Sequence, residues 1–468
     1  MRARILAAAL LAWPSALHAQ GYSAEVSVFG STIDLRDVAR DSLPEGEVPG
    51  DGLTRRLDDG TVVTCVPEGF CRWFPAGAER SVALVVQDVR VSAWPGIRGL
   101  AAHAHVRGRY GSDGFWPRSD QELEAVTAYV SWERSDFRVR AGRQHRTNGL
   151  GYYNFDGGSV LWRGLEPLRI DVYGGWSLAR NLNAPRTGSL LEEADEFAPD
   201  DRGHILGVDV TGRVEELATV GFSYMREIRT DERALYTERV AGEIGVLWRR
   251  IALDLSADYD LAFGEIHEAS ARVATPLPRG FEVAAQARRY VPQFELWTIW
   301  GAFSPVGFDE GRVWLGWRDD RFRLRGGAAW RSYDDTRTGA DFVGFEEGGW
   351  SAFGSAGWRR SGWFADVSYR AQEGSGAARY GGDLSAGRDF GGGRWISAHA
   401  TSSQSFSEFR LGEQVTAGVG VKGGYRLGDL DLSAGWARYG ITYEDRPRGD
   451  DWTQHRAHVG VRYRLGTE

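Results

Sequence analysis

Short segments in which every second residue is apolar recur from about residue 80 almost to the end of the chain. In residues 251–261, the odd positions hold Ile, Leu, Leu, Ala, Tyr and Leu, whereas the even positions hold Ala, Asp and Ser. Side chains of a β-strand alternate between two faces, so such a strand has one apolar face and one polar face. A long series of these segments, with no helical pattern between them, predicts an all-β fold: a transmembrane antiparallel β-barrel.

The connections between these segments come in two sizes. Tight turns such as residues 318–320 contrast with long acidic or glycine-rich stretches such as residues 181–202, and membrane barrels combine short turns at one end with longer loops at the other. At about 20–24 residues for each strand and its connection, the region after residue 80 holds about 16–20 strands, and we expect about 18. A barrel of this width leaves an aqueous channel.

The chain divides into three regions. Residues 1–19 have the pattern of a secretory signal peptide, with two arginines before a short apolar core and a small residue at the expected cleavage site. Residues 20–79 are rich in turn formers, above all over 41–52, so we expect an irregular extramembrane or plug-like segment, lying in the periplasm or in the lumen. Residues 80–468 are predicted to form the outer-membrane barrel.

The composition is compatible with a membrane barrel. The mean hydropathy of −0.38 is ordinary for a water-soluble protein, but half of each barrel strand faces water in the lumen, so the average hides the apolar half. After the first residues, no segment is long and apolar enough to predict a spanning helix. The 19 Trp and 17 Tyr residues suit the two membrane interfaces.

The only cysteines of the chain are Cys65 and Cys71. In an exported protein, two cysteines so close in sequence predict a disulfide that closes a small loop. A metal pair is the weaker interpretation, because no further ligands lie nearby in the sequence.

The polar phase of the predicted strands carries charged residues that would face the lumen. Basic and acidic side chains on opposed walls would create a transverse field that selects solutes by charge and dipole. The simpler alternative is that opposite charges pair across neighbouring strands of a wet wall. The lumen-facing candidates are Arg138, Arg140, Arg169, Asp171, Asp254, Asp258, Asp260, Arg321, Arg323, Arg325, Asp366, Arg370, Lys422, Arg426, Asp429, Asp431, Arg462 and Arg464.

Two other polar groupings were weighed as metal sites. Carboxylates gather in the predicted loops at residues 192–201 and 444–451, where they either bind cations that bridge lipopolysaccharide or form solvated loop faces. His103 and His105 share one strand face, but a metal site would need a third ligand from a neighbouring strand. We therefore predict no metal site and no cofactor.

Local motifs of hydrolytic enzymes are missing from the sequence. It has no Gly-x-Ser-x-Gly elbow, no His-Glu-x-x-His and no P-loop. Because catalytic triads assemble in space rather than in sequence, this leaves catalysis as a minor alternative. We predict that the chain is not an enzyme and name no catalytic residue.

Residues 139–144 read Val-Arg-Ala-Gly-Arg-Gln, and residues 152–158 read Tyr-Tyr-Asn-Phe-Asp-Gly-Gly. In residues 136–177, the chain resembles outer-membrane porins of the alginate-export type. The resemblance implies an 18-stranded barrel that moves a solute through a charged pore. The positions that carry it are Gly142, Arg143, Gln144, Phe155, Asp156 and Gly157.

The matching segment has a physical interpretation of its own. Arg143 and Asp156 could pair to hold a loop against the wall, or the segment could be a plain hairpin. The family's substrate-contacting residues cannot be placed by motif, so no substrate is carried over. The chain also departs from the usual aromatic last residue of such barrels, because Tyr463 is followed by a polar tail.

The sequence thus predicts a barrel of the bacterial cell outer membrane that acts as a passive or weakly selective pore for small polar solutes. The alternatives are a non-conducting structural or surface-interaction barrel, an outer-membrane enzyme, and a soluble sandwich whose apolar faces pack together. The expected partners are outer-membrane lipid and lipopolysaccharide, small polar solutes and the barrel-assembly machinery, with no nucleic acid. The oligomeric state is left open.

Overall fold

The computed structural model describes residues 21–38, 41–66, 69–73, 75–112, 123–178, 203–229, 235–291, 307–334, 348–374, 379–405, 414–443 and 451–466. The predicted signal peptide and the acidic clusters at residues 192–201 and 444–450 lie outside these residues.

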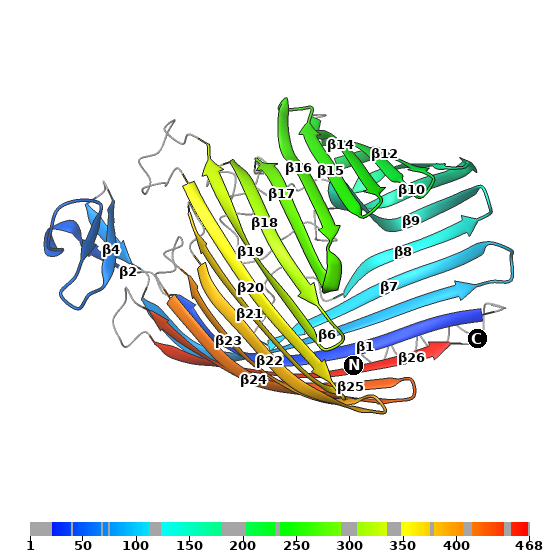
Figure 1. Ribbon diagram of the computed structural model, residues 1–468. Helices are drawn as coiled ribbons and strands as arrows, with labels where there is room; N and C mark the ends of the chain where they lie inside the picture. The colour runs from blue at the N-terminus through cyan, green and yellow to red at the C-terminus, as the bar shows by residue number, and fades with distance from the viewer. Residues whose placement is uncertain are drawn as a thin grey trace.

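In the described residues, 22 antiparallel strands form one closed sheet (Figure 1). Each strand pairs with the strands before and after it, and β1 closes the ring by pairing with β26 on one side and β6 on the other. A closed ring pairs the backbone groups of every strand on both sides, as the interior of a membrane requires. The wall strands are β1 (Gly21–Val38), β6 (Ala76–Trp94), β7 (Leu100–Gly111), β8 (Leu123–Glu133), β9 (Phe137–Asn148), β10 (Gly151–Leu165), β11 (Leu168–Ser177), β12 (Gly203–Val214), β13 (Ala218–Arg229), β14 (Leu235–Trp248), β15 (Ile251–Asp260), β16 (Glu265–Pro276), β17 (Phe281–Tyr290), β18 (Phe308–Arg318), β19 (Phe322–Tyr333), β20 (Gly348–Arg360), β21 (Trp363–Glu373), β22 (Arg379–Gly391), β23 (Arg394–Ser405), β24 (Gln414–Leu427), β25 (Leu430–Tyr443) and β26 (Trp452–Gly466).

The predicted class is confirmed, but the predicted number of about 18 strands is wrong. The estimate allowed about 20–24 residues for each strand and its connection, whereas several hairpins are more compact than that. The pair β24 and β25, for example, occupies only residues 414–443, with Gly428 and Asp429 as the whole connection between the strands.

The predicted barrel boundary at residue 80 is also wrong, because the wall begins at Gly21. Strand β1 lies between β26 and β6 over its length, with Val26 opposite both Tyr463 and Val89. Apolar and polar residues do alternate in β1, but the strand is followed by a segment rich in turn formers and was therefore assigned to the same irregular region. These turn formers belong to an insertion between the first two wall strands rather than to an irregular N-terminal segment.

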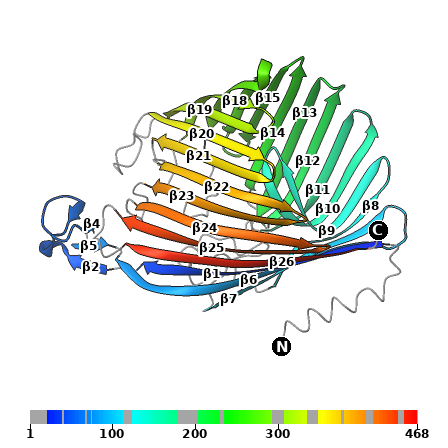
Figure 2. The same cartoon turned by 60° about the horizontal axis from the view of Figure 1, so that its bottom comes forward.

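The insertion folds as a second, four-stranded antiparallel sheet. Its strands are β2 (Asp41–Pro44), β3 (Thr54–Arg56), β4 (Val62–Val66) and β5 (Phe70–Trp73), in the order β2-β5-β4-β3, with a 3-10 turn, η1, at Glu45–Glu47. The predicted disulfide is confirmed, because Cys65 and Cys71 are bonded to each other and join β4 to β5. The two views show the small sheet beyond the end of the wall and outside the lumen (Figures 1 and 2).

The two ends of the barrel differ in their connections. At one end the strands are joined by two to five residues, for example Arg249 and Arg250 between β14 and β15; β16 and β17 are joined there by a 3-10 turn, η4 (Pro278–Gly280). The first and last wall strands, β1 and β26, start and stop at this end, where Ser23 lies opposite Gly466. The small sheet and the longest connections lie at the other end.

The outer face of the wall exposes large apolar side chains. Val313 and Leu315 on β18 are 59% and 50% exposed, and Trp330 on β19 is 62% exposed. Soluble proteins rarely expose continuous apolar surface, so the outer face suits lipid, and the soluble sandwich with hidden apolar faces is wrong. Aromatic residues ring the end with short turns, as at a membrane interface: Trp162, Trp248, Phe281, Phe322, Trp363, Tyr425 and Tyr463.

None of the described residues forms a helix that is long and apolar enough to cross a membrane.

Candidate functional site: the charged lumen

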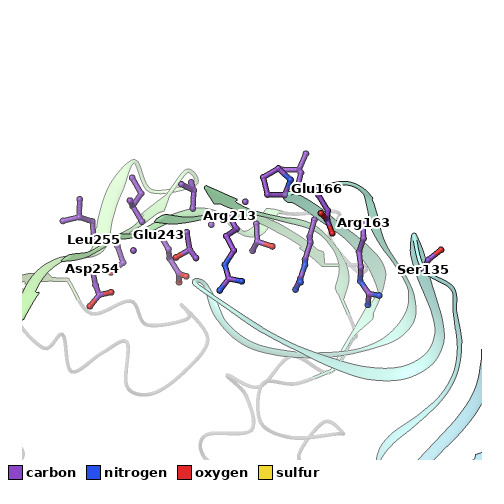
Figure 3. Close-up of a pocket in the computed structure, with 18 residues that line it drawn as sticks. Ser135, Arg163, Glu166, Arg213, Glu243, Asp254 and Leu255 are labelled. Atoms are coloured by element: carbon purple, nitrogen blue, oxygen red, sulfur yellow. The ribbon is translucent and has the colours of Figure 1, made fainter. Parts of the chain in front are cut away.

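The inner face of the wall carries the charged phase of the strands. In a close-up of β10 to β15, the side chains of Arg213, Glu243 and Asp254 lie on the face of the wall opposite to Leu255 (Figure 3). Cross-strand register extends this face around the ring, since Asp254 lies opposite Arg272 on β16 and Gly245 on β14. Residues that share a row in this register share a face.

The register places the predicted lumen residues as follows. The positions on the inner face are Arg138, Arg140, Arg169, Asp171, Asp254, Asp258, Asp260, Arg323, Arg325, Asp366, Arg370, Lys422, Arg426, Asp431, Arg462 and Arg464. Arg321 and Asp429 instead lie in short turns, before β19 and β25. The alternating pattern extended one residue too far at these two places, because β19 begins at Phe322 and β25 begins at Leu430. A role in conduction stays a prediction for all of them.

Many of the inner charges are paired across neighbouring strands. The carboxylate of Glu25 on β1 forms two ion pairs. Its Oε1 lies 2.8 Å from Nη1 of Arg90 on β6, and its Oε2 lies 3.2 Å from Nε of Arg464 on β26. Arg239 on β14 is paired with Asp258 on β15, and both are buried. This pairing neutralises large parts of the wall, so the local field of the lumen depends mainly on the charges that remain unpaired.

Five arginines gather on β16 to β21 around a cavity of about 640 Å³. We call this group, Arg272, Arg312, Arg325, Arg331 and Arg370, the arginine cluster. Glu310 pairs with Arg312 at 2.8 Å and with Arg331 at 2.7 Å. The guanidinium of Arg325 lies 5.3 Å from the ring centre of Trp314, which holds it in place without neutralising it.

The arginine cluster is therefore a positively charged part of the lumen. Within the described residues, no carboxylate lies at ion-pair distance from Arg325 or Arg370, and Arg272 reaches Asp254 only at 3.8 Å. A cation that is not neutralised attracts anions into a water-filled channel.

The hairpin of β9 and β10 folds into the lumen instead of continuing along the wall. At its tip, the carbonyl oxygen of Leu150 accepts a 3.3 Å hydrogen bond from Nη1 of Arg239 on β14. Strands β11, β12 and β13 separate β10 from β14, so a tip that stayed in the wall would lie about 19 Å away, at about 4.8 Å per strand. The tip therefore crosses the inner faces of three strands.

Other contacts along the hairpin follow the same route. Nη2 of Arg146 donates to Asp171 on β11 at 2.9 Å, and Nδ2 of Asn148 donates to Asp209 on β12 at 2.7 Å. An apolar cluster joins the hairpin to the wall beneath it and consists of Leu150, Tyr153, Phe155, Tyr173, Ile205, Met225 and Ala241. These contacts hold the hairpin as a fixed obstruction on one side of the lumen.

The residues that carry the family resemblance lie where this hairpin leaves the wall. They face one another in register: Gly142 opposite Gly157, Arg143 opposite Asp156, and Gln144 opposite Phe155. Nε and Nη2 of Arg143 donate to the two carboxylate oxygens of Asp156 at 2.7 and 2.9 Å. A bidentate ion pair of this kind fixes the two strands relative to each other.

Glycines make the bend at this point possible. Gly142 has a φ of 124°, a conformation that favours glycine, and a Cβ on it would lie 2.3 Å from the carbonyl oxygen of Ala128 on β8. A Cβ on Gly157 would lie 2.1 Å from the carbonyl oxygen of Gly174 on β11. The four neighbouring strands β8 to β11 thus approach one another more closely here than side chains allow.

A second cavity of the inner face lies on β10 to β15, near the end with short turns (Figure 3). It has a volume of about 1040 Å³. Its lining includes Arg163, Arg169 and Arg213, with Glu166 beside Arg163, and Glu243 and Asp254 lie farther along the wall on β14 and β15 (Figure 3). The hairpin tip reaches this cavity, because a Cβ on Gly149 would lie 2.7 Å from Oε1 of Glu243.

The two histidines weighed as metal ligands have polar partners instead. Nε2 of His105 lies 2.6 Å from Asp88, and Nδ1 of His103 lies 2.9 Å from Oγ of Ser92. In the part of the chain that the structure describes, no group of three or more His, Cys, Asp and Glu side chains could hold a metal ion.

Sequence reasoning missed the inward hairpin and several residues of the cavities, among them Arg213, Glu243 and Trp314. The alternating pattern tells on which face of a strand a side chain lies. A cavity depends in addition on which strands are neighbours and on small residues between the charges. The glycines at 142 and 157 were a signal for close backbone approach, although they do not tell which way the hairpin bends.

No family model matches the sequence, and no curated protein matches it. Solved structures similar to the chain include Pseudomonas aeruginosa OccK8 (OprE), at 10% identity and a TM-score of 0.41, covering 96% of this chain and 98% of that one. Acinetobacter baumannii OccAB1 matches at 10% identity and a TM-score of 0.41, covering 97% and 98%. The outer membrane protein opdK from Pseudomonas aeruginosa matches at 9% identity and a TM-score of 0.40, covering 95% of this chain and 99% of that one. TM-scores near 0.4 at such low identity carry no argument about the function of this chain.

Proposed function

We propose that this protein is a passive pore of the bacterial outer membrane for small polar solutes, with a preference for anions. The observation that carries the proposal is the division of one closed wall into an exposed apolar outer face and a charged inner face. A closed barrel with these two faces satisfies its backbone in lipid and encloses water. The inward hairpin narrows a lumen that 22 strands alone would leave wide.

The preference for anions follows from the arginine cluster. Its excess positive charge lines one wall of the lumen, whereas Glu25, Asp258 and Asp431 are held in ion pairs. The net charge of −8 does not oppose this preference, because local charge at the pore wall decides selectivity.

The end with short turns would face the periplasm, since membrane barrels have their short turns there. The disulfide-linked small sheet would then face the cell exterior, where an oxidised pair persists. Lipopolysaccharide and the barrel-assembly machinery are the partners that this setting implies. The resemblance of residues 136–177 to alginate-export porins, and the prediction that the chain is not an enzyme, stay predictions.

Planar-bilayer recordings test the proposal. The purified, folded barrel should form open channels in KCl, and under a salt gradient the reversal potential should have the sign of an anion-preferring pore. A folded barrel that inserts but stays silent would support the structural or surface-interaction alternative. A cation-preferring channel would refute the role given to the arginine cluster.

A further inference from the structure

The large cavity on β10 to β15 holds opposite charges apart instead of pairing them. The register shows one row that runs Arg169, Thr211, Gly221, Glu243 across β11 to β14. A second row runs Arg213, Thr219, Gly245, Asp254 across β12 to β15. Both rows thus have an arginine at one end, a threonine and a glycine between, and a carboxylate at the other end.

The spacing within each row prevents direct contact between its ends. Three strand spacings separate the arginine from the carboxylate, which is about 14 Å between backbones. The residues between are short, namely Thr211 and Gly221 in the first row and Thr219 and Gly245 in the second. The floor between the two charged sides is therefore open, as the volume of about 1040 Å³ indicates.

Like Arg325 and Arg370, these charges have no close ion-pair partner in the part of the chain that the structure describes. Arg169, Arg213 and Glu243 are exposed to the cavity, and among the described residues none of them has an ion pair. Asp254 has only the contact of 3.8 Å with Arg272. Unpaired charges of opposite sign that face one cavity provide binding groups for both ends of a dipolar solute.

We propose that this cavity binds short zwitterionic solutes, namely peptides of two or three residues. The carboxylate end of the peptide lies against Arg169 and Arg213, and its ammonium end lies against Glu243 and Asp254. An extended tripeptide spans at most about 10 Å, which matches the gap once the long side chains lean inward. The hairpin tip at Gly149 covers the Glu243 end of the site. This inference rests on the proposed pore function, because it names solutes that the pore admits.

Block of the channel current by peptides of one length and different charge tests the site. The probes are triglycine, N-acetyltriglycine, which lacks the ammonium, and triglycine amide, which lacks the carboxylate. Triglycine should interrupt the current at a concentration about tenfold lower than either capped peptide, which is the effect of about 1.4 kcal/mol from the second charged contact.

Variants separate the two ends of the site. Glu243→Gln should weaken triglycine block about tenfold and leave N-acetyltriglycine unchanged, whereas Arg213→Gln should weaken both. The exchange of all four charges, Arg169→Glu and Arg213→Glu with Glu243→Arg and Asp254→Arg, reverses the two ends of the site, so block by triglycine should persist with the peptide bound in the opposite direction. Arg250→Gln and Glu216→Gln, in exposed short turns outside the cavity, are controls that should leave the block unchanged.

Equal block by triglycine and both capped peptides in a conducting channel would overturn the site while leaving the pore intact. A folded barrel that does not conduct would overturn the pore function instead. In that case, calorimetry of triglycine with the purified barrel in detergent still decides the site: binding that Glu243→Gln abolishes supports it, and absence of binding refutes it.

Discussion

The inward hairpin makes a quantitative prediction about the width of the pore. Leu150 at its tip is 4% exposed and belongs to the apolar cluster with Ile205, Met225 and Ala241. Truncating a buried leucine to alanine costs about 2–5 kcal/mol. Asn148→Ala removes in addition the hydrogen bond to Asp209, at a cost of about 1 kcal/mol.

The double variant Leu150→Ala with Asn148→Ala should therefore weaken docking of the hairpin by at least about 3 kcal/mol. This raises the ratio of undocked to docked hairpin more than about 100-fold, at 1.4 kcal/mol for each factor of ten. Because the hairpin occupies part of the lumen, single-channel recordings should show steps to a larger conductance that the unaltered protein rarely visits.

A disulfide provides the matched control. A Cβ on Gly149 would lie 3.1 Å from Cβ of Ala241, and a shift of the tip by less than about 1 Å brings this distance into the range of disulfides, so Gly149→Cys with Ala241→Cys should bond under oxidising conditions. In the double-alanine background, this bond should abolish the large steps, and a reductant that leaves the native disulfide intact should restore them. Unchanged conductance in the double-alanine variant would refute the position of the hairpin in the lumen.

Three further predictions concern other parts of the molecule. Arg325→Glu with Arg370→Glu reverses two charges of the arginine cluster, so the reversal potential should move toward that of a cation-preferring pore; an unmoved potential would place selectivity elsewhere. Gly142→Val should sharply lower the yield of folded barrel, measured by heat-modifiable gel migration, because the φ of 124° and the carbonyl of Ala128 oppose a side chain, whereas Gly212→Ala, with no heavy atom within 4 Å of the added Cβ, should fold normally. Cys65→Ser with Cys71→Ser should destabilise the small sheet by about 2 kcal/mol and make it sensitive to protease while the wall stays protected; loss of the wall as well would contradict its independence.

The sequence predicts the wall of this protein well because the alternation of a strand is a local property. The two faces of β15 can be assigned from residues 251–260 alone, and the structure places Asp254 and Leu255 on opposite faces as expected. The disulfide is likewise local, since Cys65 and Cys71 are separated by few residues. The strand number was underestimated because it depends on the length of each connection, which alternation does not measure.

The sites within the lumen could be predicted only in part. Arg169 and Asp254 were assigned to the inner face, but their shared cavity depends on small residues three strands apart in register. The contact of Leu150 with Arg239 joins residues 89 positions apart, and it exists only because the hairpin bends at glycines. Such long-range geometry depends on the closure of the whole sheet and leaves no periodic pattern in the sequence.

Cysteine accessibility along β15 tests the central claim most directly, namely that the charged face encloses water and the apolar face contacts lipid. The chain's only cysteines are bonded to each other, so single cysteines can be placed at Leu253, Asp254, Leu255 and Ser256 in turn. In barrels reconstituted into lipid vesicles, a charged thiol reagent should modify the cysteines at 254 and 256 rapidly and those at 253 and 255 slowly. The reverse order, or equal rates at all four positions, would contradict the assignment of the two faces and the pore with it.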